Sequence, residues 1–179
     1  KHYVTGTPLP KLAVPFPEGR LVYDFVFDKS KCKWVPWLDT LESKALDVEA
    51  EYTSIIVPTV DTVRYTYLLD KLVQHNFHCL FVGPTGTGKT VYVKKHLQTG
   101  LPESFTSMLM TFSAQTSANM TQDIIDGKMD KRKRGIYGPP AGKRMVVFVD
   151  DLNMPQIEEY GAQPPIELLR QWMDHGGWY

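Results

Sequence analysis

The sequence has little cysteine, no long apolar run and no excess of either charge. Its two cysteines, Cys32 and Cys79, lie far apart and match neither a metal-ligand spacing nor a disulfide framework. This usage suits a reducing compartment, and we expect both thiols to be buried. The 20 basic residues balance the 20 acidic ones, so no overall charge attracts the chain to nucleic acid, a membrane surface or an acidic partner.

The apolar runs are also too short for a membrane-spanning helix. The longest, at 79–82 and 145–149, fall far below the roughly 20 residues needed to cross a bilayer. The chain begins with Lys1 and has no charged-then-apolar signal segment, so we expect a soluble protein cut from a longer chain. Its 179 residues, 42% of them hydrophobic, are enough for one globular domain with a small appendage.

Residues 1–54 predict an extended connecting segment that contains a β-hairpin. Prolines and glycines are dense in the first part of this segment and oppose both helix and central strand. Two β-prone stretches, 21–27 and 32–37, flank a polar turn at 28–31 and therefore predict the hairpin. The stretch 38–53 is polar and weakly periodic, which predicts an irregular or partly helical connection.

Residues 55–179 alternate between helix and strand patterns. An apolar run at 55–59 precedes a helix whose expected buried face carries Tyr65, Leu68, Leu69, Leu72 and Val73. The expected elements that follow are a strand at 79–82, a helix at 88–98, a strand at 107–112, a helix at 119–129, a strand at 145–149 and a last helix opened by Pro164 and Pro165. The expected inner face of this last helix carries Ile166, Leu169, Trp172 and Met173. The order predicts an α/β fold with a parallel sheet flanked by helices.

A glycine-rich loop between the first of these strands and the next helix is the most specific feature of the sequence. It satisfies G-x-x-x-x-G-K-[ST] at every fixed position with Gly83, Pro84, Thr85, Gly86, Thr87, Gly88, Lys89 and Thr90. Glycines let backbone amides curl around an anion at a helix N-terminus, where the helix dipole adds positive potential. In such a loop Lys89 contacts the β- and γ-phosphates, and the Thr90 hydroxyl is a ligand of Mg²⁺. The loop therefore predicts a site for a nucleoside triphosphate, ATP with Mg²⁺, and we expect Val91 to line it as well.

An apolar strand that ends in two carboxylates predicts the acidic partner that a phosphate loop needs. Asp150 follows the run 145–149 and is expected to hold Mg²⁺, directly or through water, opposite Thr90. Asp151 is the candidate carboxylate for orienting the attacking water, and with Lys89 it forms the candidate catalytic pair. Many P-loop ATPases have glutamate there, and aspartate is shorter by one methylene, so whether Asp151 supports hydrolysis stays open. The alternative is an ordinary pair of turn residues at a strand end.

Several segments together resemble the AAA+ motor units of dynein heavy chains, in particular the third unit of axonemal dyneins. Besides the glycine-rich loop, they are V-P-T-V-D-T-V-R-Y from Val57, F-S-A-Q-T-S-A-N from Phe112, D-D-L-N-M-P from Asp150 and Y-G-A-Q-P-P-I-E-L-L-R-Q from Tyr160. The resemblance covers the whole length and is weakest at 38–53. It implies the P-loop NTPase fold of a large AAA+ subdomain, truncated here, within a ring of such units. It also implies adenine contacts from Ile56, Val57, Pro58 and Thr59.

The resemblance further implies a function, partners and a location. As part of a heavy chain, the unit binds ATP or ADP with Mg²⁺ and contributes to ATP-driven, microtubule-based ciliary motility. Its partners are the neighbouring AAA+ units of the same chain, and other dynein chains and microtubules through parts outside these residues. Its location is the cytoplasm and cytoskeleton, in the axoneme of a cilium or flagellum. The sensor residues, arginine finger, lid subdomain and stalk are expected outside the chain, so we expect hydrolysis by the chain alone to be near background.

Two other functions stay open. A nucleotide-binding regulatory module would keep the pocket but hydrolyse little, and the short side chain of Asp151 favours it. A nucleic-acid-remodelling AAA+ protein would need the basic residues between Lys128 and Arg144 to form a continuous groove. A solvated helix end and loop is the simpler interpretation of those residues. Arg170 lies within a predicted helix and is more simply a packing or interface residue than an arginine finger.

Overall fold

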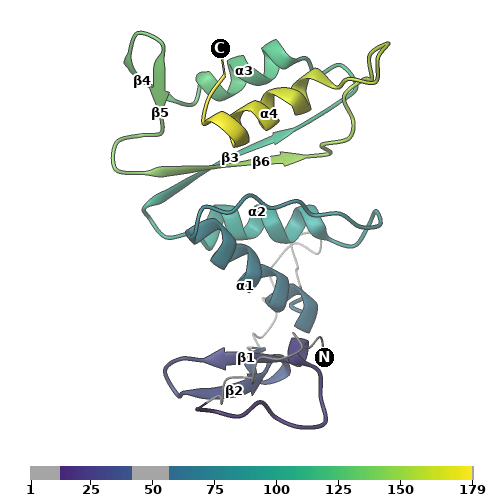
Figure 1. Ribbon diagram of the computed structural model, residues 1–179, viewed down its shortest axis with the longest axis vertical. Coiled ribbons are helices and arrows are strands. Elements are labelled where there is room, and N and C mark those ends of the chain that lie inside the picture. Colours follow the sequence, from purple (N-terminus) through teal and green to yellow (C-terminus); the bar gives the residue numbers. More distant parts are fainter. Residues whose placement is uncertain (1–12, 42–56, 179) are drawn as a thin grey trace, which may run out of the picture. The chain divides into compact units, whose positions relative to one another are not determined.

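The computed structural model describes residues 13–41 and 57–178, which belong to two compact units that divide between Tyr67 and Leu68. Figure 1 shows the elements of each unit along the chain. Within the described residues, no helix combines the length and the hydropathy that crossing a bilayer requires.

The first unit contains the predicted β-hairpin. β1 (Phe25–Asp28) pairs antiparallel with β2 (Lys33–Pro36), and the rings of Phe27 and Trp34 lie edge to face with centroids 5.1 Å apart. Two short 3-10 helices, η1 (Val22–Asp24) and η2 (Trp37–Thr40), replace the outer ends of the stretches that were expected to be strands. The hairpin is therefore confirmed, with shorter strands than the β-prone residues suggested.

The tip of the hairpin corrects the prediction of a buried thiol. Asp28 closes the turn by accepting hydrogen bonds from the backbone amide and the hydroxyl of Ser30. Cys32 follows in the left-handed region with φ of 47° and is exposed. A turn at the end of a two-stranded hairpin has no second layer to cover it, so the thiol stays in solvent.

The helix α1 (Val60–Gln74) is buried along only part of its expected inner face. Leu69 and Val73 are buried and pack against Val93 and Leu97 of α2 (Lys89–Thr99). Tyr65 and Leu68, by contrast, are 57% and 53% exposed. A helical face is buried only where another element lies against it, so the periodicity overstated the length of the buried stripe.

The centre of the second unit is a parallel pair of strands. β3 (Phe105–Thr111) pairs with β6 (Arg144–Asp150) in a continuous register from Phe105↔Arg144 to Thr111↔Asp150. Helices cover both faces of this pair, with α1 and α2 on one face and α3 (Ala118–Asp126) and α4 (Pro164–His175) on the other (Figure 1). The predicted α/β fold with a parallel sheet flanked by helices is confirmed.

Alternate residues of the two strands feed two separate cores. Leu109 and Phe148 face the cluster made with α1 and α2. Met108, Met110 and Val147 face the cluster made with α3 and α4. Because both faces are covered, β6 is apolar without interruption from Met145 to Val149, and β3 has the shorter apolar run Met108–Met110.

Two of the four residues predicted for the inner face of α4 lie in the core, and a third, Ile166, is only half-buried. Pro164 and Pro165 open it as expected, and Leu169 and Trp172 pack against the second core cluster. Met173 was also expected inside but is 54% exposed. Trp172 packs against the core cluster, and the side chain of Met173, one residue further around the helix, points away from the sheet.

The apolar run 79–82 does not form the predicted strand. Leu80 and Val82 are 71% and 83% exposed, and Cys79 is exposed as well, contrary to the prediction of a buried thiol. A strand exists only where a neighbouring strand bonds its amides and carbonyls. In the described part of the chain, β6 pairs with β3 alone, and no strand lies against 79–82.

A second hairpin takes the place of the predicted helix end and loop. After α3 ends at Asp126, β4 (Asp130–Lys133) and β5 (Ile136–Gly138) pair antiparallel on either side of Gly135, whose φ is 73°. All of β4 is exposed. Lysine and aspartate are depleted in strands, so local composition does not predict this hairpin.

Candidate functional site

The glycine-rich loop leads directly into α2 through two left-handed glycines. Gly86 has φ of 80°, and Gly88, the N-cap residue of α2, has φ of 78°. A side chain is strained in this region of the backbone map, so glycine is the residue that permits the turn. The loop thereby presents backbone amides at a helix N-terminus, the arrangement that binds phosphate groups.

Lys89 lies over this loop. Its Nζ donates to the carbonyl oxygens of Gly83 and Pro84 at 3.0 and 2.5 Å, and it lies 3.2 Å from Oγ1 of Thr87. All three acceptors are neutral, and no carboxylate among the described residues forms an ion pair with this ammonium group. The positive charge of Lys89 is therefore available to an anion at the mouth of the loop.

Thr90 and Asp150 meet although they are 60 positions apart in the chain. The Thr90 hydroxyl donates to Oδ1 of Asp150 at 2.8 Å, and Nζ of Lys94 lies 3.1 Å from Oδ2. The backbone carbonyl of Asp150 accepts a 2.9 Å hydrogen bond from the amide of Phe112, which holds the end of β6 beside the end of β3. The structure thus brings together the two residues predicted to hold a metal ion.

The ionised form of Asp150 is stabilised in this position. Burial of the carboxyl group by itself favours the neutral acid, but the hydrogen bonds from Thr90 and Lys94, together with the charge of Lys94, outweigh it. The pKa of Asp150 is consequently below its ordinary value. A hydroxyl and an ionised carboxylate are the oxygen donors that Mg²⁺ takes from a protein beside phosphate oxygens, so this pair fits that ion.

Asp151 differs from Asp150 in backbone and in surroundings. It follows the last residue of β6, has φ of 53°, and is exposed. Its carbonyl oxygen accepts from the amide of Met154 at 3.0 Å, which forms a turn after the strand. Among the described residues, no hydrogen bond or ion pair involves its carboxylate, so its role in orienting water stays a prediction.

The residues expected around the adenine base are only partly described. Ile56 lies outside the described residues. Val57, which is 60% exposed, Pro58 and Thr59 precede α1, and Oγ1 of Thr59 caps that helix by accepting from the amide of Thr62 at 3.2 Å. These residues belong to the first compact unit, and their contact with adenine stays a prediction.

Two further residues predicted to line the nucleotide site are exposed. Thr85 lies in the exposed part of the loop, and Val91 in the first turn of α2 is 49% exposed.

Lys94 is the residue of this site that the sequence analysis missed. It lies on α2 four residues after Thr90, and side chains at this spacing share one helix face. That spacing was the available indication, because it predicts that both side chains reach the same strand end. The lysine was not singled out since lysine is common on exposed helix surfaces.

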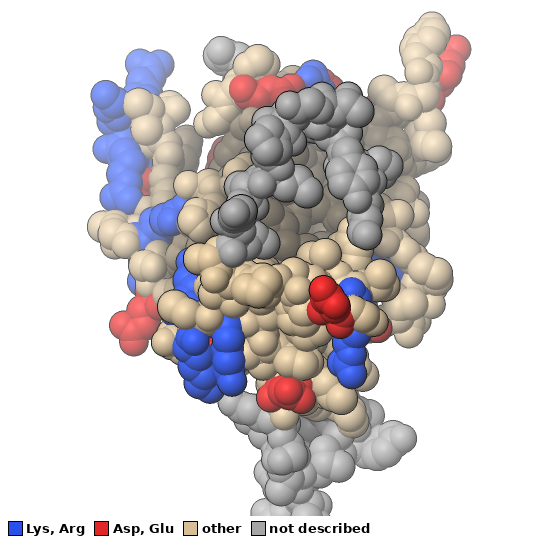
Figure 2. All heavy atoms as spheres, turned by 60° about the horizontal axis from the view of Figure 1, so that its bottom comes forward, with Lys and Arg blue, Asp and Glu red and all other residues tan. Residues whose placement is uncertain are grey.

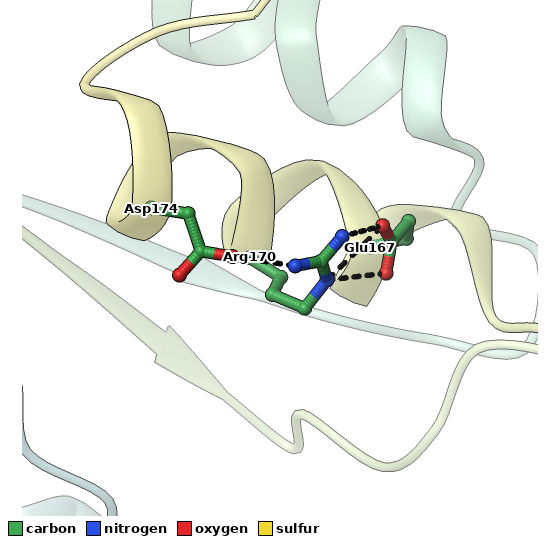
Figure 3. A network of polar contacts seen from close by, with 3 residues as sticks. All are labelled: Glu167, Arg170 and Asp174. Carbon is green, nitrogen blue, oxygen red and sulfur yellow. Dashed lines mark hydrogen bonds and ion pairs between the residues drawn. The ribbon is translucent and has the colours of Figure 1, made fainter.

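Arg170 is held by carboxylates of its own helix (Figure 3). Its guanidinium group donates to Glu167 and Asp174, one turn before and one turn after it on α4. This pairing raises the pKa of Arg170 and lowers the pKa of Glu167. A transition-state arginine must have its donors free to reach phosphate, so this pairing argues against an arginine finger. The side chain is 57% exposed, so the predicted packing role is not borne out, and the ring-interface role stays a prediction.

Four of the basic residues between α3 and β6 lie on the β4–β5 hairpin, namely Lys131, Arg132, Lys133 and Arg134. Figure 2 shows Lys and Arg side chains gathered in a column over this hairpin. Lys131, Arg132 and Lys133 belong to the exposed strand β4, and Arg132 donates to the carbonyl oxygen of Pro139. A projecting two-stranded ribbon does not form the continuous groove that a nucleic-acid-remodelling enzyme would need.

Two family models match the chain. Residues 44–179 match the P-loop containing dynein motor region, and residues 2–39 match the dynein heavy chain AAA lid domain. The second match corrects the expectation that no lid subdomain lies within the chain. The lid was missed because short β-prone stretches between prolines carry no pattern specific to a lid.

Axonemal dynein heavy chains resemble this chain over nearly its whole length. Dynein axonemal heavy chain 1 of Mus musculus is 48% identical over 96% of this chain and 4% of its own length. For dynein axonemal heavy chain 12 of Rattus norvegicus the identity is 49% over 100% of this chain and 6% of the relative. Dynein axonemal heavy chain 3 of Homo sapiens is 48% identical over 92% of this chain and 4% of its own length.

This chain therefore spans only a small fraction of these heavy chains. The family match nevertheless covers most of its residues, including the glycine-rich loop and the strand that ends at Asp150. The family implies nucleotide binding and further AAA units in the same heavy chain. The chain belongs to the P-loop motor-region family of dynein heavy chains, as an AAA+ module of the axonemal type.

Proposed function

We propose that this chain is the nucleotide-binding part of the third AAA+ unit of an axonemal dynein heavy chain, and that it binds ATP or ADP together with Mg²⁺. The observation that carries the proposal is the 2.8 Å contact between Thr90 and Asp150. This contact places a hydroxyl and a carboxylate beside a loop whose amides and Lys89 suit phosphate.

Each residue of the site has a separate task in this proposal. The loop amides of 83–90 and the ammonium group of Lys89 hold the β- and γ-phosphates and stabilise the charge that develops on them. Thr90 and Asp150 would hold Mg²⁺, which would supply positive charge to neutralise the phosphate oxygens. Asp151 orients the water that attacks the γ-phosphorus, and the products are ADP and inorganic phosphate. Ile56, Val57, Pro58 and Thr59 contact the adenine base, and Val91 completes the nucleotide contacts.

The proposed role in the whole heavy chain is to couple nucleotide turnover to ciliary motility on microtubules. Its immediate partners are the neighbouring AAA+ units of the same chain, and its place is the axoneme of a cilium or flagellum. Support comes from the axonemal heavy chains that match over nearly all of these residues.

We divide the chain into a segment at 1–54 and a large subdomain at 55–179. The lid match at 2–39 precedes this subdomain, so we assign that lid to the preceding unit.

A second candidate function is a regulatory nucleotide site with little hydrolysis of its own. The exposed position of Asp151 and its left-handed backbone favour it, because a water-orienting carboxylate must be held within about an angstrom of its productive position. Such a site would still bind nucleotide and would act by changing the populations of ring conformations. Single-turnover phosphate release separates the two candidates, since only the first requires chemistry at this site.

The test of the proposed function is a titration of Lys89→Ala with Mg-ATP. We would use the complete heavy-chain motor with the phosphate-loop lysine of every other AAA+ unit replaced, so that this site dominates binding. Loss of a charged hydrogen-bond donor costs about 1.5 to 3 kcal/mol, roughly ten- to a hundredfold in affinity. Lys95→Ala, an exposed lysine on the same helix, is the matched control and should bind as the parent does. Equal affinity of Lys89→Ala and the parent would contradict the proposed site.

A further inference from the structure

Both carboxylate oxygens of Asp150 are engaged by side chains of α2. Thr90 contacts Oδ1 at 2.8 Å, and Nζ of Lys94 lies 3.1 Å from Oδ2. Thr90 and Lys94 are one helical turn apart and approach the end of β6 from the same face of the helix. The proposed metal-binding carboxylate therefore already has a cationic partner within the protein.

This contact differs from an ordinary surface ion pair. Exposed pairs contribute little because both groups are well solvated and both side chains are free to move. The Asp150 side chain is only 15% exposed, against 36% for Lys94. The backbone of Asp150 is also fixed by its parallel pairing with β3 and by the amide of Phe112. Lys94 thus meets a carboxylate that is partly shielded from water and held in place.

No other cation among the described residues pairs with Asp150. Lys89 contacts neutral oxygens of the loop, and the neighbouring Lys95 is exposed. The charge balance around the proposed metal position therefore depends on Lys94. Lys94 is not needed to bind phosphate in the proposed function, so its contact with the metal-binding carboxylate has no role assigned there.

We propose that Lys94 is a built-in counter-ion of Asp150 that sets the Mg²⁺ dependence of nucleotide binding. The inference rests on the proposed function, because it concerns the same site. Without a metal ion, the Lys94 ammonium neutralises a carboxylate that would otherwise repel a polyphosphate. When Thr90 and Asp150 hold Mg²⁺, the Lys94 ammonium would either stay near the dication and repel it or withdraw and give up its ion pair. Both outcomes lower the affinity of the site for the metal ion.

Lys94 consequently has opposite effects on the two forms of the ligand. It assists binding of the metal-free nucleotide and opposes binding of Mg²⁺. A residue that merely stabilised α2 would affect both forms in the same direction, since damage to the helix would weaken the whole loop. The opposite signs therefore distinguish positioning of charge from structural support.

The test compares Lys94→Met with Lys95→Met in the same motor with its other sites disabled. A fluorescent ATP analogue is first titrated in EDTA, and Mg²⁺ is then titrated at fixed nucleotide concentration. For Lys94→Met we expect the Mg²⁺ concentration at half-saturation to fall by about three- to tenfold. We expect the affinity for the analogue in EDTA to fall by about two- to fivefold. Changes of this size are expected from the loss of one partly screened charge. Lys95→Met should leave both quantities unchanged, and Lys94→Arg should restore both toward the parent values.

The outcomes separate this inference from the function on which it rests. If the parent does not bind the analogue, the proposed function and the role of Lys94 both fall. If the parent binds and Thr90→Ala loses its Mg²⁺ dependence while Lys94→Met keeps the parental midpoint, only the role of Lys94 falls. A Lys94→Met variant that is weaker in both titrations would also overturn it, because that result indicates a structural residue.

Discussion

Gly88 and Tyr92 are so close that a Cβ atom on Gly88 would lie 2.8 Å from Cε2 of Tyr92. Gly88 also has φ of 78°, so two independent constraints favour glycine at the N-cap of α2. Gly86 has nearly the same φ, but among the described residues no heavy atom beyond Gly86 and its two chain neighbours lies within 4 Å of the position that its Cβ would take. An alanine at Gly86 would therefore cause backbone strain alone, whereas an alanine at Gly88 would cause backbone strain and a side-chain clash.

Gly88→Ala should weaken Mg-ATP binding more than Gly86→Ala does. Both substitutions place a side chain in the left-handed region at a cost of about 1 to 2 kcal/mol, and only the first also displaces an aromatic ring. Equilibrium titrations of the two variants measure the difference. Adding Tyr92→Ala should recover part of the loss in Gly88→Ala and none in Gly86→Ala. Equal losses in the two single variants would show that the contact with Tyr92 is unimportant.

Ile125→Ala should destabilise the second unit by about 2 to 5 kcal/mol, because it leaves a cavity between α3 and the sheet. Ile125 is 1% exposed and belongs to the core cluster of Met108, Met110 and Phe112. Ile124, its neighbour on the same helix, is 46% exposed and provides the matched control. Ile124→Ala should change stability by less than about 1 kcal/mol. Urea unfolding of the smallest heavy-chain segment that unfolds cooperatively measures both, and similar losses would contradict the assigned core.

Acid should remove a stabilising contribution of Asp150. Its pKa in the folded protein is below the ordinary value of 3.8, so the folded state favours the ionised carboxylate. The contribution is complete above the unfolded-state pKa and is lost as the pH falls through the lower folded-state value. The unfolding free energy of the parent should therefore decline relative to Asp150→Asn as acid is added. In Lys94→Met this decline should be smaller, and parallel pH profiles of parent and Asp150→Asn would refute the assignment.

Hydrolysis by the 179-residue chain alone should be near background, even under conditions in which it binds nucleotide. Stabilising the transition state requires preorganised charge, and an arginine finger contributes about 10³- to 10⁵-fold in rate. The guanidinium group of Arg170 is held by Glu167 and Asp174 and is not free to reach phosphate. Asp151→Glu should not rescue the chain alone, whereas in the complete ring the longer side chain is expected to raise turnover at this site. Robust single-turnover phosphate release that Lys89→Ala abolishes would show a self-sufficient catalytic centre instead.

Local patterns predicted most elements of the second unit. The helices α1, α2, α3 and α4 and the strands β3 and β6 all lie where periodicity, prolines and apolar runs placed them, within a few residues. The two elements that failed are the strand at 79–82 and the β4–β5 hairpin. Both depend on pairing between segments, which is a property of neighbours and not of local composition.

The sequence by itself determined the identity of the phosphate loop, because Gly86, Gly88, Lys89 and Thr90 belong to one contiguous motif whose chemistry is local. Only the tertiary structure decided how Asp150 is used. The parallel register of β3 and β6 sets its backbone position, and the packing of α2 on the sheet brings Thr90 and Lys94 to its two oxygens. The sequence also could not distinguish Lys94 from Lys95, which are adjacent and chemically identical. The helical rotation of about 100° between consecutive residues turns one of them toward the carboxylate and leaves the other in solvent.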